Sequence, residues 1–344
     1  MKILHVIDTL MIGGAERVMV DLSNILHENG EDVSALFLLE KGPLSCELNP
    51  QIKQYELFRY KRFSVKCICR FIRIAKHYDI IHVHMRHCFE YVSFVSLLHP
   101  SLKKKVVFHD HYGDINIDDK CPVILKASLR HHLAVYIGVS EQLVDWAKRN
   151  GTSNCFLLPN IVRKQVTEVP SSSNVVGFVS VGNIRQTKNY EYLAELARQF
   201  PNENFTIYGN INSPDYWDKI RKMIGNNVNV VKGVSRVQPL LRNYRLAIHC
   251  APSETGPLVL IEYLAQGIPF VVYRTGEVVR QIQDDLPELI VDNFEIQNWL
   301  DRIGFIEQHY EEIQEKMSTV YEKYYSEQTY YNKCKTIYQN VQDC

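Results

Sequence analysis

The sequence predicts an α/β protein made of two doubly wound parallel sheets, and three observations lead to this fold class. The chain has 344 residues, which corresponds to two domains of ordinary size. Short β-rich segments alternate with longer helical patterns, an order that builds parallel sheets with right-handed crossovers. The alternation restarts after a stretch with a serine cluster beside a proline, residues 163–174, which is typical of a linker between domains.

Both halves contain β-rich segments with the length of buried strands. The predicted strands of the first half are residues 2–8, 32–39, 80–84, 104–111, 133–140 and 155–162. Those of the second half are residues 175–182, 204–209, 227–233, 246–252, 268–273 and 288–293. Helical patterns cover residues 15–30, 64–77, 141–151, 189–200 and 254–267, and the chain from 294 to its end. Because ligands of parallel sheets bind beyond the carboxyl ends of the strands, we expect the site in the cleft between the two domains.

Composition and charge exclude several classes of protein. The 39 basic and 39 acidic residues cancel, so a general polyanion surface and a nucleic-acid partner are not expected. Nine cysteines without a C-x-x-C pair argue against a zinc ribbon or a disulfide framework and favour a reducing cytoplasm. The apolar part of the N-terminus is too short for a signal peptide, and no apolar run reaches the roughly 20 residues of a membrane span. We therefore expect a cytoplasmic protein, attached at most to a membrane surface.

A glycine pair follows the first predicted strand. The strand ends near Asp8, Gly13 and Gly14 allow a tight turn, and a helix begins at about Ala15. Free N–H groups of such a turn favour an anion or a sugar hydroxyl, although a plain strand-to-helix turn is an equal alternative. The pattern is not G-x-G-x-x-G, and no acidic residue ends the second strand, so a nicotinamide enzyme is disfavoured.

A second loop carries cations at the carboxyl end of the first predicted strand of the second sheet. In VGNIRQTKNYEYL a strand ends at Gly182, and Arg185 and Lys188 follow before the next helix. Two cations at this place suit a diphosphate, and the alternative is an ordinary solvated loop.

The segment APSETGPLVLIEYLAQGIPFVV, residues 251–272, places two carboxylates in an otherwise apolar run. Pro257 suits the first turn of a helix and Gly267 its C-terminal cap, so Glu262 lies within the helix and Glu254 in the loop before it. The alternative makes Glu254 a helix N-terminal acid and Glu262 a partly exposed helix residue.

Backbone amides near Leu258 and Val259 would point from the start of this helix toward the cleft. An anion on these amides, with a carboxylate on either side to accept hydrogen bonds from hydroxyls, matches the layout of a nucleotide sugar.

These residues together resemble glycosyltransferase family 4, whose retaining members have the GT-B fold of two facing Rossmann-like domains. E-T-G-P-L-V-L-I-E, residues 254–262, is similar to the E-x7-E signature of the family. The resemblance runs nearly the whole length of the chain. Its further segments are GGAER (13–17), IGVSEQL (137–143), LLPNIV (157–162), VSVGNIRQTKN (179–189), FTIYGN (205–210) and VVKGVS (230–235).

The resemblance implies a division of labour. Residues 1–163 would form an acceptor-binding domain and residues 164–325 a domain that binds the nucleotide sugar. The last helix, 326–344, would cross back to pack on the first domain. The family uses no resident cofactor, and no metal ion is expected because no D-x-D motif stands at a strand end.

The resemblance also implies roles for single residues. Glu262 would bind the ribose, Glu254 the hydroxyls of the donor sugar beside the reacting carbon, and Lys188 the diphosphate and the departing charge. The remaining donor-binding candidates are Gly13, Gly14, Asn183, Arg185, Gly209, Val234, Thr255, Gly256, Pro257, Leu258 and Val259.

Two positions need comment. Asn183 stands where the family often has an arginine, so either Arg185 reaches the phosphate instead or Lys188 and the helix amides suffice. In the segment around 109–111 we favour His111, and next His109, as a residue close to the donor sugar or the acceptor.

The histidines allow a different hypothesis, a metal-dependent hydrolase. His82 and His84 would point to one face of their strand, and His109 and His111 to one face of theirs. No further ligand cluster occurs in the C-terminal half, so we expect structural roles for His82 and His84 instead.

A basic segment indicates a membrane-facing surface. Residues 60–76 carry six cations and no acid, with Phe63, Cys67, Phe71 and Ile74 at helical spacing, and lysines follow within 102–105. A basic amphipathic helix can lie on an anionic membrane, and a solvated helix over a packed core is the alternative.

The sequence thus predicts a retaining, metal-independent glycosyltransferase that uses a nucleotide sugar, with a UDP-sugar favoured. The acceptor would be a glycan or a polyprenyl-linked oligosaccharide, as in bacterial capsule or O-antigen synthesis. A protein that binds the nucleotide sugar without turnover is the alternative.

Overall fold

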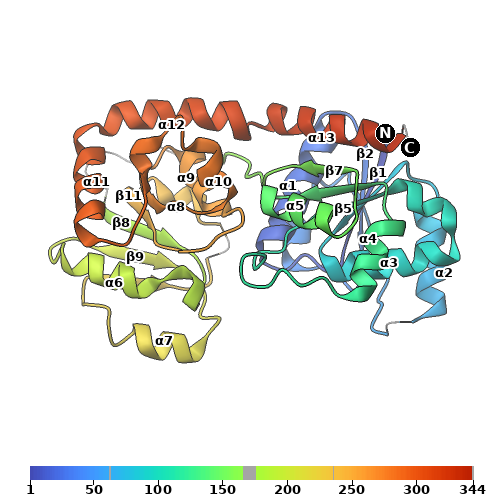
Figure 1. Cartoon of the computed structure of the whole chain (residues 1–344), viewed down its shortest axis with the longest axis horizontal. Coiled ribbons are helices and arrows are strands. Elements are labelled where there is room, and N and C mark those ends of the chain that lie inside the picture. Colours follow the sequence, from blue (N-terminus) through green and yellow to red (C-terminus); the bar gives the residue numbers. More distant parts are fainter. Residues whose placement is uncertain (62, 166–175, 235, 343–344) are drawn as a thin grey trace. The chain divides into compact units, whose positions relative to one another are not determined.

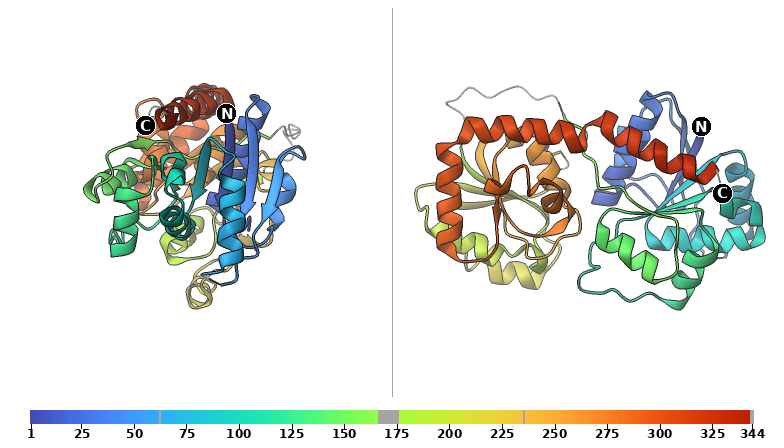
Figure 2. Two further views of the ribbon diagram at one scale, coloured as in Figure 1. Left: turned by 90° about the vertical axis from the view of Figure 1, so that its right-hand side faces the viewer. Right: turned by 45° about the horizontal axis from the view of Figure 1, so that its top comes forward.

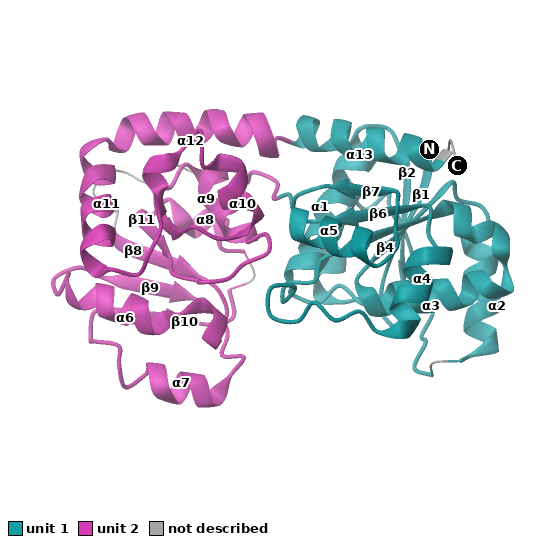
Figure 3. Ribbon diagram, in the orientation of Figure 1, with its two compact units in different colours: residues 1–161, 327–344 teal, residues 162–326 magenta. Residues whose placement is uncertain are grey.

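The computed structural model describes residues 1–61, 63–165, 176–234 and 236–342, and the chain divides into two compact units. Unit 1 comprises Met1–Ile161 and Glu327–Cys344, and unit 2 comprises Val162–Ser326 (Figure 3). Each unit contains one parallel sheet with helices packed on it (Figure 1). Most of the predicted linker, 163–174, and Arg62 of the basic segment lie outside the described residues.

Unit 1 has a seven-stranded sheet in which every pair is parallel, with the order β3-β2-β1-β4-β5-β6-β7. Its strands are β1 (Lys2–Ile7), β2 (Asp32–Phe37), β3 (Lys53–Glu56), β4 (Ile80–His84), β5 (Val106–Asp110), β6 (Val135–Gly138) and β7 (Cys155–Leu157). Its helices are α1 (Gly14–Glu28), α2 (Val65–Ala75), α3 (Arg86–Leu98), α4 (Val123–His131), α5 (Glu141–Arg149) and α13 (Glu327–Gln342). The central strands are buried because helices cover both faces of such a sheet, and most of their residues are apolar.

Unit 2 has a six-stranded parallel sheet with the order β10-β9-β8-β11-β12-β13. Its strands are β8 (Val176–Val181), β9 (Phe205–Tyr208), β10 (Val228–Val231), β11 (Tyr244–His249), β12 (Phe270–Tyr273) and β13 (Ile290–Val291). Its helices are α6 (Tyr190–Arg198), α7 (Pro214–Ile220), α8 (Gln238–Leu241), α9 (Leu258–Gln266), α10 (Gly276–Ile282), α11 (Ile296–Gln308) and α12 (Tyr310–Tyr325). The predicted fold class, two doubly wound parallel sheets, is therefore confirmed.

The last helix, α13, is dark red in Figure 2 and belongs to unit 1. It contacts α1, β6 and the 3-10 helix η2 (Pro100–Lys105). The Tyr331 hydroxyl donates to a carboxylate oxygen of Glu31 at 3.1 Å. The Tyr338 hydroxyl lies 2.6 Å from Nδ1 of His82 in the sheet. A segment at the end of the chain thus completes the core of the N-terminal unit.

Several elements differ from the sequence-based expectation. The strand predicted to begin at residue 104 begins at Val106, because the lysines before it belong to η2. The helix predicted over 254–267 begins at Leu258, and Pro257 is its N-cap instead of a first-turn residue. The edge strand β3, with the sequence KQYE, has no apolar alternation, so its pairing with β2 was not predictable from pattern.

Within the described ranges, no helix is both long enough and apolar enough to cross a membrane.

A substitution at Gly177 in β8 tests the packing of the sheet in unit 2. A Cβ at this position would lie 2.0 Å from the Asn204 carbonyl oxygen, which is backbone and cannot move aside cheaply. We expect Gly177→Ala to lower the free energy of unfolding by roughly 1–3 kcal/mol. Gly304→Ala in α11 is the matched control, because its Cβ would meet nothing within 4 Å. Urea denaturation of both variants checks this, and equal stability of the two would contradict it.

Candidate functional site

The strongest cluster of predicted residues lies at the carboxyl edge of the sheet in unit 2. Lys188 ends a 3-10 helix, η4 (Gln186–Lys188), that follows β8, and Glu254 lies in the loop that follows β11. β8 and β11 are hydrogen-bonded neighbours, so their carboxyl ends bring together two residues that are 66 positions apart in the chain. The sheet order therefore places the predicted cation beside the predicted carboxylate.

Lys188 and Glu254 form an ion pair between Nζ and Oε1, and their side chains are only 13% and 11% exposed. Nε2 of His249, the last residue of β11, lies 3.3 Å from the same carboxylate oxygen. Burial alone would raise the pKa of Glu254, but the Lys188 ammonium and the His249 side chain lower it to about 2. The carboxylate is thus ionised across the physiological range, and burial lowers the pKa of His249 so that its imidazole is neutral there.

The turn after β12 holds the backbone that carries Glu254. The backbone N–H of Glu254 donates to Oγ1 of Thr275 at 3.2 Å. Gly276 has a φ of +81°, and a Cβ there would meet Cβ of Glu254 at 3.1 Å and Cδ of Pro257 at 3.2 Å. Only glycine combines this backbone angle with this approach. Sequence reasoning missed His249, Thr275 and Gly276, although a histidine and a Thr-Gly pair at strand ends were visible signals.

The helix α9 follows this loop and carries the second predicted carboxylate. Gly267 caps its C-terminus in the left-handed conformation with a φ of +65°, as predicted from the sequence. Glu262, the fifth residue of α9, is half-buried. Leu258 and Val259 begin the helix, where backbone N–H groups have no acceptor within the helix itself.

The residues between Glu254 and α9 are well packed. Thr255 is buried, and its carbonyl accepts a hydrogen bond of 2.8 Å from the N–H of Glu277 at the start of α10. Gly256 is half-buried and Pro257 is buried. Contacts within unit 2 therefore fix the loop that leads into α9.

Three neighbouring loops are linked at the same edge of the sheet. The Asn210 N–H donates to Oδ1 of Asn183 at 3.1 Å, and the Gly233 N–H donates to Oδ1 of Asn210 at 3.0 Å. A Cβ on Gly209 would lie 1.9 Å from the Gly182 carbonyl oxygen, so this position requires glycine. The predicted donor-binding residues after β8 and β9 thus stand in one network.

Asn183 stands where the family often has an arginine, and its side chain accepts a hydrogen bond within this network. Arg185 is exposed at the start of η4, whereas the Lys188 side chain is largely buried. Val234, which follows β10, is half-buried against the core of unit 2. The roles of these residues in donor binding stay predictions.

Unit 1 places its candidate residues at the carboxyl edge of its own sheet. Gly13 is the N-cap of α1 and Gly14 its first residue, in the loop that follows β1. A Cβ on Gly13 would lie 2.4 Å from a carboxylate oxygen of Glu16, so the Glu16 side chain folds back over this turn. Nearby, Asp8 is paired with His87 at 2.9 Å.

His109 and His111 lie at the end of β5 and in the residues that follow it. His109 is fully buried, and His111 is partly exposed and interacts with the Asn160 side chain. They belong to a layer of five histidines with His5, His82 and His84.

A cation holds the segment that carries His111, and sequence reasoning missed it. Arg86 pairs with the buried Asp110 at 2.9 Å, and the Tyr136 hydroxyl donates to Asp110 at 3.0 Å. The guanidinium also lies 4.0 Å from the ring centre of Tyr112 and 4.2 Å from that of Trp146. The chain on both sides of His111 is thus fixed by one arginine.

The predicted basic helix forms as α2 with a different apolar face. Its buried residues are Cys67, Ile68, Phe71 and Ala75. Phe63 precedes the helix and is 63% exposed, and Ile74 is only partly buried. Lys66, Arg70 and Arg73 point to solvent.

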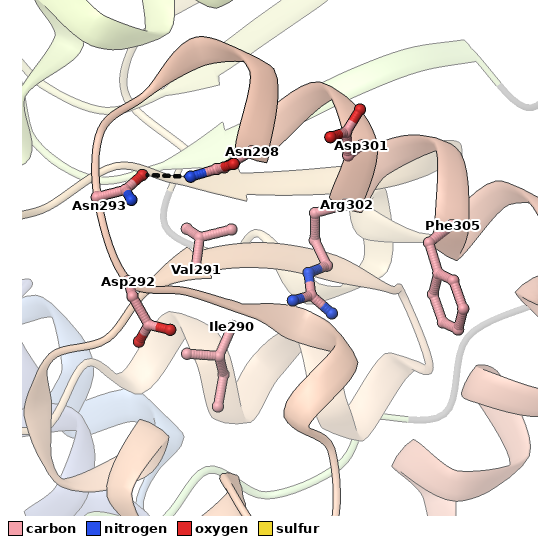
Figure 4. A pocket seen from close by; sticks show the side chains of 8 residues that line it. All are labelled: Ile290, Val291, Asp292, Asn293, Asn298, Asp301, Arg302 and Phe305. Atoms are coloured by element: carbon pink, nitrogen blue, oxygen red, sulfur yellow. Dashed lines mark hydrogen bonds between the residues drawn. The ribbon is translucent and has the colours of Figure 1, made fainter.

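A cavity of about 350 Å³ lies elsewhere in unit 2 (Figure 4). Its lining residues belong to β13, α11 and the turn between them: Ile290, Val291, Asp292, Asn293, Asn298, Asp301, Arg302 and Phe305. Nδ2 of Asn298 donates to Oδ1 of Asn293 at 2.8 Å and ties the turn to the helix. This cavity is formed by the last strand of the sheet, and not by the loops that carry Lys188 and Glu254.

Two glycosyltransferase family models match this chain, one over each half. The model of Glycosyltransferase Family 4 matches residues 12–165, and that of Glycosyl transferases group 1 matches residues 163–323. An uncharacterized glycosyltransferase of Haemophilus influenzae is 23% identical over 301 residues, which cover 78% of this chain and 79% of that protein.

Solved structures share the fold. Anabaena Alr3699/HepE, in complex with UDP and glucose, superimposes with a TM-score of 0.80 at 14% identity over 98% of each chain. A glycosyltransferase of Rickettsia africae has a TM-score of 0.76 at 16% identity, over 99% of this chain and 98% of that one. A variant of S. aureus TarM, in complex with Fondaparinux, alpha-GlcNAc-glycerol and UDP, has a TM-score of 0.75 at 14% identity, over 98% of this chain and 100% of that one.

Two parallel-sheet units, matched in turn by the two glycosyltransferase models, define a glycosyltransferase of the GT-B fold. The two models together cover residues 12–323, so the chain is a glycosyltransferase of the family 4 type, as the E-x7-E segment predicted.

The coupling between Lys188 and Glu254 can be measured directly. We expect Lys188→Met to raise the pKa of Glu254 from about 2 toward or above its ordinary value of 4.5, because burial then dominates. In the wild type, the folded pKa lies below the unfolded one, so Glu254 stabilises the fold above pH 4.5. This stabilisation is lost as the pH falls through 4.5 toward 2. Carboxyl ¹³C NMR titration gives the pKa. Lys219→Met, which removes the exposed partner of Glu191, is the control. An unchanged Glu254 titration in Lys188→Met would refute the coupling.

Proposed function

We propose that the protein is a retaining glycosyltransferase that moves a sugar from a nucleotide-sugar donor, with a UDP-sugar favoured, to a glycan or polyprenyl-linked acceptor. The observation that carries the proposal is the buried contact of Lys188, Glu254 and His249 beside the start of α9. A cation, a carboxylate and free helix amides at one sheet edge suit a diphosphate joined to a polyhydroxylated sugar. The UDP complexes of Alr3699/HepE, which share this fold, support the choice of base.

The candidate residues of unit 2 each receive a role in donor binding. Lys188 leaves Glu254 for the diphosphate, and Glu254 then accepts hydrogen bonds from hydroxyls of the donor sugar. Glu262 binds the ribose, and the amides of Leu258 and Val259 face the phosphates. The loops at Asn183, Arg185, Gly209, Val234, Thr255, Gly256 and Pro257 complete the donor site.

The reaction needs no protein nucleophile. The acceptor hydroxyl attacks the anomeric carbon on the face from which the nucleotide leaves, and its proton passes to the departing phosphate. The C–O bond to the phosphate breaks as the new glycosidic bond forms, which retains the anomeric configuration. Lys188 and the amides of α9 compensate the charge that develops on the diphosphate, so the proposed mechanism assigns no step to a metal ion.

Unit 1 binds the acceptor in this proposal. The turn at Gly13 and Gly14 would bind the phosphates or the sugar, and His111, with His109 second, would act close to the reacting groups. Arg86 positions the segment with His111 through Asp110.

Variants of the ion pair separate a catalyst from a binding module. We expect Glu254→Gln and Lys188→Ala to lower kcat by about 10²–10³-fold, because each removes a charge that acts on the reacting groups. Transfer is followed as UDP release with UDP-sugars chosen by a thermal-shift screen, and Lys219→Ala is the control. If the wild type binds nucleotide sugars without turnover and these variants lose only affinity, the protein is a non-catalytic binder. Anomeric ¹H NMR of the product tests retention, and an inverted product would contradict it.

The second part of the proposal concerns the acceptor side. We propose that the protein works in the cytoplasm on the inner face of a bacterial membrane, in the synthesis of capsule or O-antigen. Lys66, Arg70 and Arg73 are exposed on α2, and the three lysines at 103–105 lie in η2 of the same unit. Exposed apolar side chains lie before α2 and at its first residue: Tyr60, Phe63 and Val65. Cations beside exposed aromatic groups suit an anionic lipid surface.

Charge reversal on α2 tests the membrane surface. We expect Lys66→Glu with Arg70→Glu to lower partition onto vesicles of phosphatidylglycerol and phosphatidylcholine at least about tenfold, because each cation near such a surface contributes about 1 kcal/mol. Lys148→Glu with Arg149→Glu on α5 is the matched control, since these residues are also exposed in unit 1. Equal sedimentation of both double variants with the vesicles would refute the proposed surface.

A further inference from the structure

The core of unit 1 contains a layer of five histidines, and the proposed transfer reaction assigns a role only to His111 and His109. His5 on β1 is in register with His82 on β4, and His84 on β4 is in register with His109 on β5. Residues in register, and residues two apart along one strand, share a face of a parallel sheet. These four histidines and His111 therefore lie on one face, where such strands normally carry aliphatic side chains.

The rings form two hydrogen-bonded rows. In one, His84 contacts Nδ1 of His5 through Nε2 at 3.0 Å and Nε2 of His111 through Nδ1 at 3.2 Å. In the other, His82 lies between the Tyr338 hydroxyl at 2.6 Å and Nδ1 of His109 at 3.2 Å.

Two groups of three rings bring nitrogen atoms within 4.8 Å of one another: His5, His82 and His84, and His84, His109 and His111. In the first group the rings of His82 and His84 are stacked at 4.5 Å with an angle of only 6°. In-plane lone pairs of two parallel rings do not converge on one point, so this inner group is a poor ligand set.

The outer group, His84, His109 and His111, fits a metal ion better. Its ring planes are inclined by 39° between His84 and His109, by 37° between His109 and His111 and by 18° between His84 and His111, so each angle exceeds the 6° of the inner pair and the His109 ring faces the other two at an angle. The 3.2 Å between Nδ1 of His84 and Nε2 of His111 is close to the edge of a tetrahedron with metal–nitrogen bonds of about 2.0–2.1 Å.

Each outer histidine also contacts a polar side chain outside the group. Nε2 of His84 contacts His5, Nδ1 of His109 contacts His82, and His111 interacts with the Asn160 side chain. Nε2 of His109 is buried and makes no hydrogen bond to a described residue, although the Leu158 backbone lies nearby. Ligand histidines in proteins are usually oriented through their second nitrogen in this way.

The burial of the layer also suits a ligand set, because burial favours the neutral imidazole, which is the form that binds a metal. His111 is partly exposed and offers a path for an ion to enter.

We propose that His84, His109 and His111 bind one zinc-class divalent ion, with His5 and His82 as the outer partners that orient the ligand rings. Three imidazoles without a carboxylate favour Zn²⁺ or Co²⁺ over Mg²⁺ or Ca²⁺, and they leave a fourth position for water. The site is separate from the donor-binding residues of unit 2, and the inference does not rest on the proposed transfer reaction.

The test uses the full chain without a histidine tag, stripped with EDTA and dialysed. We expect titration with CoCl₂ to give visible d–d absorption that saturates at one equivalent, and ZnCl₂ to displace it. ZnCl₂ should raise the Tm by several degrees, because an ion that binds only the folded state stabilises it. MgCl₂ should produce neither effect. Saturation at no defined stoichiometry, or no absorption at all, would overturn the proposal.

Variants assign the ligands. We expect His111→Ala and His109→Ala to lower Co²⁺ affinity at least a hundredfold, whereas His5→Asn lowers it about 10–100-fold as an outer partner. His131→Ala, an exposed histidine of the same unit, should bind as the wild type does. Circular dichroism confirms the fold of each variant, and His111→Ala keeps the test informative if the buried variants do not fold. Wild-type affinity in folded His111→Ala would overturn the proposal. So would loss of binding in His87→Ala, which belongs to a separate group with Asp8 and Cys88.

Discussion

Lys188 and Glu254 can form their contact only if β8 and β11 are neighbours, because each residue stands on a loop that leaves the carboxyl end of one of these strands. Parallel pairing sends all such loops to one edge of the sheet. The same edge receives the Asn183–Asn210–Gly233 network and the start of α9. The chemistry of unit 2 therefore depends on strand order first and on the identity of single residues second.

Backbone constraints around the ion pair explain several small residues. Gly209 has no room for a Cβ beside the Gly182 carbonyl, and Gly276 combines a positive φ with close contact to Glu254. A carboxylate held in this way has little conformational freedom, so it loses little further conformational entropy when it binds a ligand. The low pKa of Glu254 has the same origin, since Lys188 and His249 approach a fixed group from two loops.

Unit 1 places polar groups in its core in a different manner. Five imidazoles occupy a sheet face, and their hydrogen bonds to one another and to Tyr338 offset part of the cost of burial. Tyr338 belongs to α13, so the end of the chain completes the polar layer as well as the apolar core. A layer of this kind restricts which side chains can replace its members, because each ring is both donor and acceptor.

Much of this protein could be predicted from the sequence because it depends on local pattern. The order of strands and helices predicted both sheets. The spacing of Glu254 and Glu262, with Gly267 after them, predicted α9 and the family. β3 was not predictable, since the pairing of an edge strand depends on a neighbour that is distant in the chain. The same reason applies to the site. His249, Thr275 and Gly276 meet Glu254, and Arg86 fixes the segment with His111, only through contacts across the sheets. Residue types and their spacing thus determined the class of protein, whereas tertiary packing alone decided which charges meet and how far their pKa values move.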